Sequence, residues 1–588
     1  MRHATQFANR LSRDRAGNIL PIAAIGLLVG ALVIGSAVDL GRTYLAQEQL
    51  QAACDAGVLA GRRAVTTNGF DAAARDSARA FFNTNYNDNA QSSRSTTFTP
   101  STPDDGNTVT ATATTVLDTL LMRVFLKDSF NISVECASSM GVGNADVMMV
   151  LDTTGSMAFS LGNTTRIAAL RAAMKNFYST MTNATSGSNA RVRYGFVPFS
   201  STVNVGRLLT DLDTRYLVDN RTVQSRIYEP DDDRDNDSYD NTWNQYSSTG
   251  YRNNYCDNRV PADDGHTDVS SGSSRYVRRK QYACRYSINR YYIYWRYAYR
   301  PYVMRYRPVA YDMTAYKTFS SVRTPIGSSG ANQNITWGGC IEERSTVNQA
   351  TFSYSPTTGI TPRAALDLDL DSRPDVNNDA TKWAPMIPQL SYTRWNDRGN
   401  YTTSSPMYDG EQAGIYCPVP ARLLGEMSKS AFDQYTDSLT AVGGTYLDIG
   451  MIWGGRMISP QGMWSDLVND EPRNGGEVAR HVIFMTDGEM EPNIYIPQAW
   501  GIEFWDRRVT TDGSSGDRAR HTQRFLATCE AIKDKGIRVW VIAFTSGLST
   551  DLTTCASDAS SYTATSASEL NSAFQEIAKQ VGELRVVE

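Results

Sequence analysis

The hydrophobic pattern of the first 65 residues predicts one long helix with two different surroundings. Residues 18–40 contain an uncharged run, rich in Ile, Leu, Val, Ala and Gly, that ends at Val38. About 20 helical residues span the roughly 30 Å hydrocarbon layer of a membrane, so we assign this segment as a transmembrane helix. From Asp39 to Ala64 the apolar residues recur at helical spacing with polar residues between them. This pattern predicts an amphipathic helix that continues from the span.

The charges before this run predict its orientation. Residues 1–17 carry Arg2, Arg10, Arg13 and Arg15 against a single acid. Positive residues favour the cytoplasmic side, so the N-terminus should be cytoplasmic and the bulk of the chain should lie outside the cytoplasm. A cleaved signal peptide is the alternative, but the apolar region of a signal peptide is shorter, about 7–15 residues.

Residues 41–142 read as a helical stalk with a small, pilin-like α+β unit. After the amphipathic helix we expect a second helix at Phe70–Tyr86, followed by a loop rich in Ser, Thr, Asn and Pro. Alternation then predicts strands at Thr108–Thr114 and Ile132–Ala137, with a short helix at Val116–Lys127 between them.

Strand and helix periods alternate in residues 143–203 and again in residues 427–588. This is the pattern of a doubly wound, mainly parallel sheet with helices on both faces. The segments that carry it are Val147–Leu151, Thr165–Thr182, Arg191–Ser200, Ala431–Leu439, Tyr446–Ile458, the strand from His481, Asp517–Lys535, Ile537–Phe544 and Ala567–Val581. Residues 204–426 interrupt the pattern and far exceed an ordinary loop of up to about 15 residues. We therefore expect one α/β domain that carries a large insertion.

The insertion contains an acidic patch, Glu229–Asp240. Its alternating Asp231, Asp233, Asp235 and Asp237 are somewhat like a calcium loop, but a glycine turn and a closing glutamate are missing. We expect a solvated acidic loop here and, by the same reasoning, at Leu366-Asp-Leu-Asp-Leu-Asp with Asp375 and Asp379.

A block rich in arginine and tyrosine, Arg275–Tyr311, follows the acidic patch. Arginine with interleaved aromatic residues can bind single-stranded nucleic acid, but this use is out of place outside the cytoplasm. We expect a twisted β-hairpin that covers the domain or meets a protein partner, and no nucleic acid.

All eight cysteines follow residue 50, in the part of the chain expected in an oxidising space where disulfides persist. Their spacing shows neither a zinc ribbon nor a CxxC redox pair. Eight cysteines allow many connectivities, so the pairs are hypotheses. Their places among the predicted elements favour Cys529–Cys555, Cys340–Cys417, Cys256–Cys284 and Cys54–Cys136.

Oxygen-bearing side chains follow the apolar run Val147–Leu151. Asp152, Thr154 and Ser156 occupy alternate positions where the strand enters a tight turn. They should therefore point the same way at one edge of the sheet. Oxygen ligands of this kind suit a hard cation such as Mg²⁺ better than zinc or copper. The simpler interpretation is that the Asp and Thr start the turn and cap the next helix.

Two distant segments resemble the rest of a known metal site. Ala441–Gly455 contains a Gly-Gly turn with Thr445 directly before a helix, and His481–Glu489 is a buried strand that ends in Asp487. Together with the Asp-x-Thr-x-Ser pattern, they make the chain similar to the von Willebrand factor type A domain with its metal-ion-dependent adhesion site. The resemblance implies that Mg²⁺, or alternatively Mn²⁺ or Ca²⁺, is held by Asp152, Thr154, Ser156, Thr445 and Asp487. It also implies that the ion keeps an open position for an acidic side chain of a protein partner.

The N-terminal helix carries a second resemblance. Val-Asp-Leu-Gly-Arg from Val38, then Leu-Gln-Ala-Ala-Cys-Asp-Ala from Leu50, is similar to the N-terminal segment of Flp (Tad) pilus-assembly proteins of the TadE/TadG type. The similarity covers about residues 16–65. It implies a single-pass protein of the bacterial inner membrane, with other pilus-assembly proteins or pilin as partners.

Composition and motifs favour binding over catalysis. A net charge of −5 gives no global basic field, and neither a Walker A run nor a GxGxxG motif is present. The chain has four histidines, and no Ser-His-Asp order stands out. We expect a membrane-anchored periplasmic assembly or adhesion factor of the pilus system, and not an enzyme. The alternatives are a membrane-anchored type A adhesin or receptor unrelated to pili and, third, a metal-dependent hydrolase in the insertion.

Overall fold

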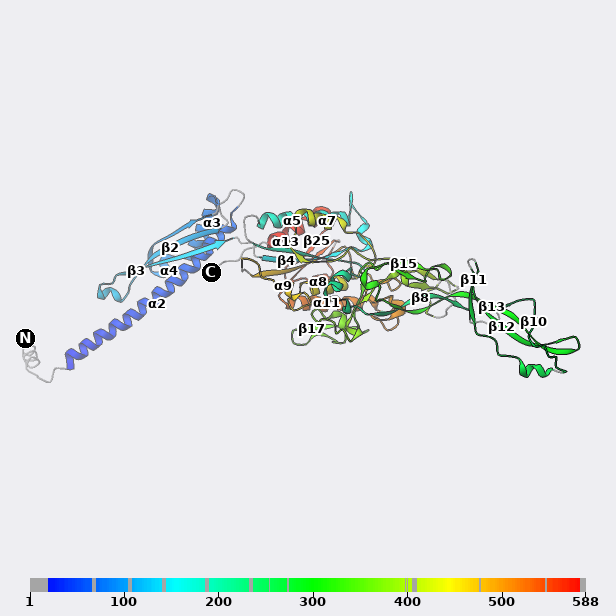
Figure 1. The fold of residues 1–588 in the computed structure, drawn as a ribbon. Helices are drawn as coiled ribbons and strands as arrows, with labels where there is room; N and C mark the ends of the chain where they lie inside the picture. The colour runs from blue at the N-terminus through cyan, green and yellow to red at the C-terminus, as the bar shows by residue number, and fades with distance from the viewer. Residues whose placement is uncertain are drawn as a thin grey trace, which may run out of the picture. The chain divides into compact units, whose positions relative to one another are not determined.

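The computed structural model divides the chain into two compact units (Figure 1). Unit 1 comprises residues 1–143, 184–190 and 582–588, and unit 2 comprises residues 144–183 and 191–581. The structure describes residues 19–65, 70–103, 108–139, 144–185, 190–231, 236–252, 254–271, 274–396, 398, 400–403, 410–474, 477–514, 516–544 and 547–581. The basic tail predicted at residues 1–17 lies outside the described residues.

Unit 1 is a long helix that carries a second helix and a three-stranded sheet. α2 (Ile19–Arg63) runs without a break through the predicted span and the amphipathic segment. Among the described residues, one helix is long and apolar enough to cross a membrane, and it is the part of α2 from Ile22 onward. Residues of the second half of α2 share a core with α3 (Ala72–Asn85) and the sheet. The antiparallel sheet has the order β1-β2-β3, with β1 at Ser93–Ser101, β2 at Thr108–Asp118 and β3 at Ser129–Ser139.

Two predictions for unit 1 were wrong. The polar loop expected after the second helix contains a one-turn helix, α4 (Asp88–Gln91), and strand β1. The helix expected at Val116–Lys127 is absent, because β2 continues to Asp118 and only Met122–Phe125 forms a 3-10 turn. Thr and Val dominate β2, and its residues alternate between buried and more exposed positions up to Leu117, as a half-buried strand requires.

Unit 2 is built on a six-stranded sheet with the order β22-β7-β4-β23-β24-β25. All neighbouring pairs are parallel except β22 with β7, which agrees with the expected doubly wound, mainly parallel sheet. The chain moves from β4 outward to one edge and then returns to β23 on the other side of β4, so the topological switch lies between β4 and β23. The strands are β4 (Asn144–Asp152), β7 (Val192–Phe199), β22 (Arg422–Gly425), β23 (Val478–Thr486), β24 (Arg538–Ala543) and β25 (Ser561–Thr563).

Helices cover both faces of this sheet. Val147, Met149 and Leu151 of β4 pack in one core with residues of three helices, α5 (Arg166–Thr185), α7 (Lys429–Ser438) and α13 (Ala567–Val581). The alternate residues Met148 and Val150 pack in a second core with α8 (Leu447–Ile458) and α11 (Asp517–Asp534). The period of two in a strand therefore divides β4 between the two layers.

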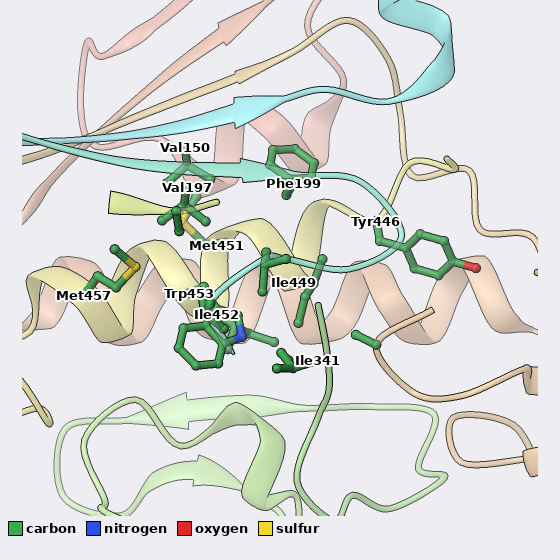
Figure 2. Packing of buried hydrophobic residues seen from close by; sticks show 14 of the residues in the cluster. Val150, Val197, Phe199, Ile341, Tyr446, Ile449, Met451, Ile452, Trp453 and Met457 are labelled. Carbon is green, nitrogen blue, oxygen red and sulfur yellow. The ribbon is translucent and has the colours of Figure 1, made fainter. Parts of the chain in front are cut away.

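Every residue of α8 is buried, because the insertion covers the side of this helix that faces away from the sheet. Figure 2 shows Val150 and Phe199 on their strands above α8, while Trp453 lies on the far side of the helix near Ile341 of the insertion. A helix with apolar residues on every face needs such cover on both sides, and α8 carries only two charged residues, Asp448 and Arg456. The insertion therefore forms part of the core of unit 2.

The sheet resumes with β22 at Arg422, so the insertion ends slightly before the predicted boundary at residue 426. The insertion contributes one long hairpin and several two-stranded sheets. Its smaller elements are α6 (Gly206–Leu212), β9 (Ser238–Tyr239), β10 (Asn244–Gln245), β11 (Thr267–Ser271), β14 (Val322–Thr324), β15 (Gln333–Ile335), β16 (Ile341–Glu342), β17 (Ser353–Ser355), β18 (Gly359–Thr361), β19 (Ala384–Pro385), β20 (Tyr392–Arg394) and β21 (Gly410–Gln412). Short elements outside it are β5 (Ser160–Leu161), β6 (Thr164–Thr165), α9 (Ser465–Val468), α10 (Glu503–Asp506) and α12 (Thr550–Cys555).

The Arg/Tyr block forms the predicted β-hairpin, which extends away from the central sheet (Figure 1). β12 (Ser274–Ser287) pairs with β13 (Arg290–Asp312), and β8 (Asn220–Pro230) pairs with the far end of β13. Its basic and aromatic side chains stack on one another, for example Arg278 on Tyr297 with 4.3 Å between the guanidinium carbon and the ring centre.

The two acidic segments are only partly solvated: Asp375 and Asp379 are exposed as predicted, but the prediction was wrong for Asp237 and Asp367. Asp237 is buried and accepts hydrogen bonds from Arg279 at 3.0 Å and Arg300 at 2.8 Å. Asp367 is buried and accepts from Trp500 Nε1 at 2.9 Å. Asp233 and Asp235 lie outside the described residues. Buried carboxylates need such partners, and here arginines and a tryptophan from distant segments supply them.

All four predicted disulfides are present. Cys54–Cys136 joins α2 to β3 in unit 1, and the other three lie in unit 2. These are Cys256–Cys284, Cys340–Cys417 and Cys529–Cys555.

Candidate metal centre

The carboxyl ends of β4 and β23 lie side by side at the topological switch of the sheet, where open α/β sheets bind their ligands. Asp152 is the last residue of β4, and Asp487 directly follows β23. Leu151 pairs with Met485 across the two strands, which places both acids at the same edge. The first helix after β4, α5, begins at Arg166.

Four of the five predicted site residues are joined by hydrogen bonds. The backbone N–H of Thr154 donates to Asp152 Oδ1 at 2.9 Å. The hydroxyl of Thr154 lies 3.0 Å from that of Ser156, and the Ser156 hydroxyl donates to Asp487 Oδ1 at 2.7 Å. Asp152, Thr154 and Asp487 are buried, and Ser156 is partly buried. Residues 331 positions apart in the chain therefore meet in one cluster of oxygen atoms.

Thr445, the fifth predicted residue, lies on the loop that adjoins this cluster. The carbonyl of Gly443 accepts from the backbone N–H of Gly155 at 3.0 Å, and Val442 N–H donates to the carbonyl of Thr153 at 2.7 Å. Gly443 has φ of +76°, a left-handed conformation that favours glycine and makes this close turn possible. Thr445 itself forms a two-way backbone bridge with Glu491, just beyond Asp487. The loop thus brings Thr445 to the same edge of the sheet.

The site holds more negative charge than its neighbours neutralise. Burial and the negative charge of Asp487 raise the pKa of Asp152 from 3.8 to about 7, although hydrogen bonds from Thr154 and Thr486 partly oppose this shift. Asp152 Oδ2 accepts from the Thr486 hydroxyl at 2.7 Å, but a neutral donor does not cancel the charge. Arg166 Nη1 lies 2.8 Å from Asp487 Oδ2, so this guanidinium balances one of the two acids. A bound cation would balance both.

The donor set fits a hard divalent cation. Two carboxylates and three hydroxyls offer only oxygen, the ligand atom that Mg²⁺, Mn²⁺ and Ca²⁺ prefer. Across the described part of the chain, no group of three or more His, Cys, Asp or Glu side chains is placed to hold a metal. A metal at this edge would therefore need the hydroxyls of Thr154 and Ser156 as well as the two acids, with Thr445 available from the adjoining loop.

Sequence reasoning missed two residues of the site, Thr486 and Arg166. Thr486 precedes the predicted Asp487 and points to Asp152. Arg166 gave a signal: a basic residue in the first turn of a helix opposes the helix dipole, and no acid in that turn of α5 compensates it. Such an arginine needs an anionic partner elsewhere, which here is Asp487.

Three comparisons with known proteins bear on identity. No curated protein matches the chain. Two solved chains match, one of them in the crystal structure of the pilus adhesin SpaC from Lactobacillus rhamnosus GG, with 10% identity and a TM-score of 0.28. That match covers 83% of this chain and 34% of the SpaC chain, and a TM-score of this size gives no support for a shared fold.

The third comparison concerns the N-terminal helix. Residues 17–80 match the model of the family described as "Putative Flp pilus-assembly TadE/G-like". The matched segment contains all of α2 and the first part of α3. The N-terminal part of the chain is therefore a TadE/G-like segment, which supports a role in Flp pilus assembly and an anchor with a single membrane-crossing helix.

Proposed function

We propose that this chain is a membrane-anchored assembly or adhesion factor of the Flp (Tad) pilus system that binds a protein partner through a divalent cation. In this proposal α2 anchors the chain in the bacterial inner membrane, and unit 2 is a von Willebrand factor type A domain on the periplasmic side. The observation that carries the binding mechanism is the meeting of Asp152, Thr154, Ser156 and Asp487 in one cluster of oxygen atoms at two neighbouring strand ends, with Ser156 and Asp487 331 residues apart in the chain.

The residues of the cluster have distinct tasks in this mechanism. Asp152 and Asp487 supply the negative charge, and their burial keeps that charge from being screened by water. The hydroxyls of Thr154, Ser156 and Thr445 add neutral oxygens, so the site does not fully cancel a double positive charge. When bound, Mg²⁺ would offer its remaining positive charge to an acidic side chain of the partner. No bond in the partner needs to break, so we propose binding without catalysis.

A second candidate function is a membrane-anchored type A adhesin or receptor unrelated to pili. The metal site would serve it equally well, but the TadE/G-like match at residues 17–80 favours the pilus system. The identity of the partner distinguishes the two functions: a pilin or pilus-assembly protein in one case, an extracellular ligand in the other.

The test compares Asp152→Ala with Asp466→Ala, which removes an exposed carboxylate on α9. The wild-type chain and the Asp466 variant should gain thermal stability in Mg²⁺ over EDTA, by about 2.7 kcal/mol at 100 times the dissociation constant. The Asp152 variant should fold and show no such gain. An equal gain in all three proteins would refute the metal site.

The same variants test the pilus role in cells that lack the gene. We expect wild type and Asp466→Ala to restore Flp pili and Asp152→Ala to fail. If all three proteins restore Flp pili, the chain acts in pilus assembly without the metal site. Normal pili in the deletion strain would instead support the adhesin or receptor function.

A further inference from the structure

The connection between β2 and β3 exposes an unusual number of apolar side chains. Its sequence from Thr119 is Thr-Leu-Leu-Met-Arg-Val-Phe-Leu-Lys-Asp. Leu120 is 58% exposed, Val124 is 74% exposed and Leu126 is 94% exposed. We call residues 119–128 the apolar loop. Water-facing loops are normally polar, so this composition indicates an apolar neighbour that unit 1 does not itself supply.

The loop is fixed to α2 at one level of that helix. The carboxylate of Asp39 accepts three backbone hydrogen bonds from it, from Leu120 at 2.9 Å, Leu121 at 2.9 Å and Met122 at 2.8 Å. One turn earlier, a Cβ added to Gly35 would stand 3.0 Å from the Cβ of Leu121, so the absence of a side chain at Gly35 lets the loop approach. Figure 1 shows the loop as the tip of the cyan hairpin beside α2.

This level coincides with the outer end of the apolar part of α2. Asp39 is 20 residues beyond Ile19, which corresponds to about 30 Å of helix, roughly the thickness of the hydrocarbon layer. Apolar residues of α2 remain exposed up to this level, with Ile34 at 65% and Val38 at 44%. The apolar loop therefore continues the exposed apolar surface of the helix sideways.

We propose that the apolar loop is a second membrane contact, with Leu120, Val124 and Leu126 inserted in the lipid at the outer edge of the bilayer beside α2. Burial of these side chains removes apolar surface from water. Arg123 and Lys127, both exposed, can reach the phosphates of the headgroups while their stems stay in the apolar layer. Asp39 is tolerated at this depth because three N–H groups and Arg42, 3.4 Å away, satisfy it. The inference rests on α2 as the anchor and is independent of the metal site.

The experiment measures the depth of single positions in vesicles of phosphatidylcholine and phosphatidylglycerol. The full chain carries one added cysteine labelled with the fluorophore NBD, at Leu126 in one variant and at Glu135 in the other. Glu135 is an exposed position farther along β3. Lipids with a nitroxide at a shallow chain position should quench the label at Leu126 and leave the label at Glu135 unquenched, while iodide in the water should do the reverse.

A third variant is labelled at Val29, in the middle of the apolar part of α2. It distinguishes failure of the loop contact alone from failure of the α2 anchor. Strong quenching at Val29 by deep nitroxides, together with a label at Leu126 that iodide reaches, would overturn the loop contact and keep the anchor. A label at Leu126 that neither quencher reaches would show a protein cover and would also overturn the proposal. No quenching at Val29 would remove the anchor and the loop contact together. Retention of the Cys54–Cys136 disulfide in each variant shows that unit 1 has folded.

Discussion

His521 of α11 lies in a fully buried pocket of negative charge, and its protonation should set the stability of unit 2 at alkaline pH. Nδ1 of His521 is 2.7 Å from Asp448 of α8, and Nε2 is 3.3 Å from Asp517 of its own helix. Burial opposes protonation, but the attraction and hydrogen bonding of the two carboxylates outweigh it and raise the pKa of His521 from 6.5 to about 9. Tyr446 and Trp500 contact the imidazole edge-on, and the Glu503 carboxylate interacts with Tyr446. The Arg524 guanidinium of the same helix lies over the Trp500 ring, 5.7 Å from its centre.

The raised pKa of His521 gives both the size and the direction of the change in stability with pH. One pKa unit corresponds to about 1.36 kcal/mol, so the shift from 6.5 to about 9 stabilises the folded state by on the order of 3 kcal/mol. The folded pKa lies above the unfolded one. The stabilisation is therefore complete below pH 6.5 and is lost as the pH rises from 6.5 through about 9.

The assay is chemical unfolding of the chain in EDTA between pH 6 and pH 10, with two matched variants. His521→Gln removes the titrating group and should reduce both the free energy of unfolding at pH 6.5 and its fall towards pH 9. His266→Gln removes an exposed histidine of the insertion and should leave the pH profile unchanged. The chain has four histidines, so NMR can follow the His521 imidazole directly. A pKa of 6.5 or lower at this residue, or equal pH profiles for wild type and His521→Gln, would refute the reasoning.

Two further predictions concern a charged residue at the candidate metal centre and one that holds the apolar loop. Arg166→Met should tighten Mg²⁺ binding about fivefold in a calorimetric titration, because its partly exposed ion pair with Asp487, worth about 1 kcal/mol, no longer competes with the ion; unchanged or weaker binding would contradict this role. Asp39→Ala should cost unit 1 about 2–4 kcal/mol and speed amide exchange at Leu120–Met122, because three N–H groups lose a charged acceptor. Asp76→Ala, which removes an exposed acid of α3, is the control, and equal exchange in both variants would count against the contact.

The sequence predicted the parts of the fold that local periodicity determines. The alternation of Val147, Met149 and Leu151 with Met148 and Val150 is visible in the sequence and corresponds to two helical layers in the structure. β25 was not predicted, because a strand of three residues, Ser561–Thr563, has no measurable period. β2 was cut short because Val116, which favours strands, is followed by several Leu residues, which favour helices, and pairing with β3 decides the outcome as far as Asp118.

The candidate site was predicted as a set of residues, and its charge balance was not. Asp152, Thr154 and Ser156 form a local pattern, and the resemblance supplied Thr445 and Asp487. The sequence around Arg166 indicates that this arginine needs an anionic partner, but no local pattern shows that the partner is Asp487, 321 residues away.

The same limit applies to the acids of the insertion. Asp237 and Asp367 read as solvated because their local sequence is polar, yet each is buried against residues from distant segments. Glu343 is another case: Arg456 of α8, 113 residues away, donates to it at 2.7 Å in the core. A run of charged residues in a sequence suggests that the segment is hydrated. Whether one of its acids is buried depends on the residues that the fold places beside it. Asp237 is paired with arginines of the insertion itself, whereas Asp367 and Glu343 are paired with residues outside it, so the burial of these acids follows from the fold of the whole unit.

Backbone donors explain why some of these contacts leave no trace in the sequence. Asp39 accepts from the N–H groups of three consecutive residues in the apolar loop, and Glu503 accepts from those of Arg508, Val509 and Thr510. Every residue except proline offers the same N–H, so the donating loop carries no residue-type signature. The acceptor does carry one: an acid at the end of an apolar helix is costly unless something satisfies it. Asp39 in the helix-exit motif therefore predicts a loop that folds back to it, although its sequence does not say which loop.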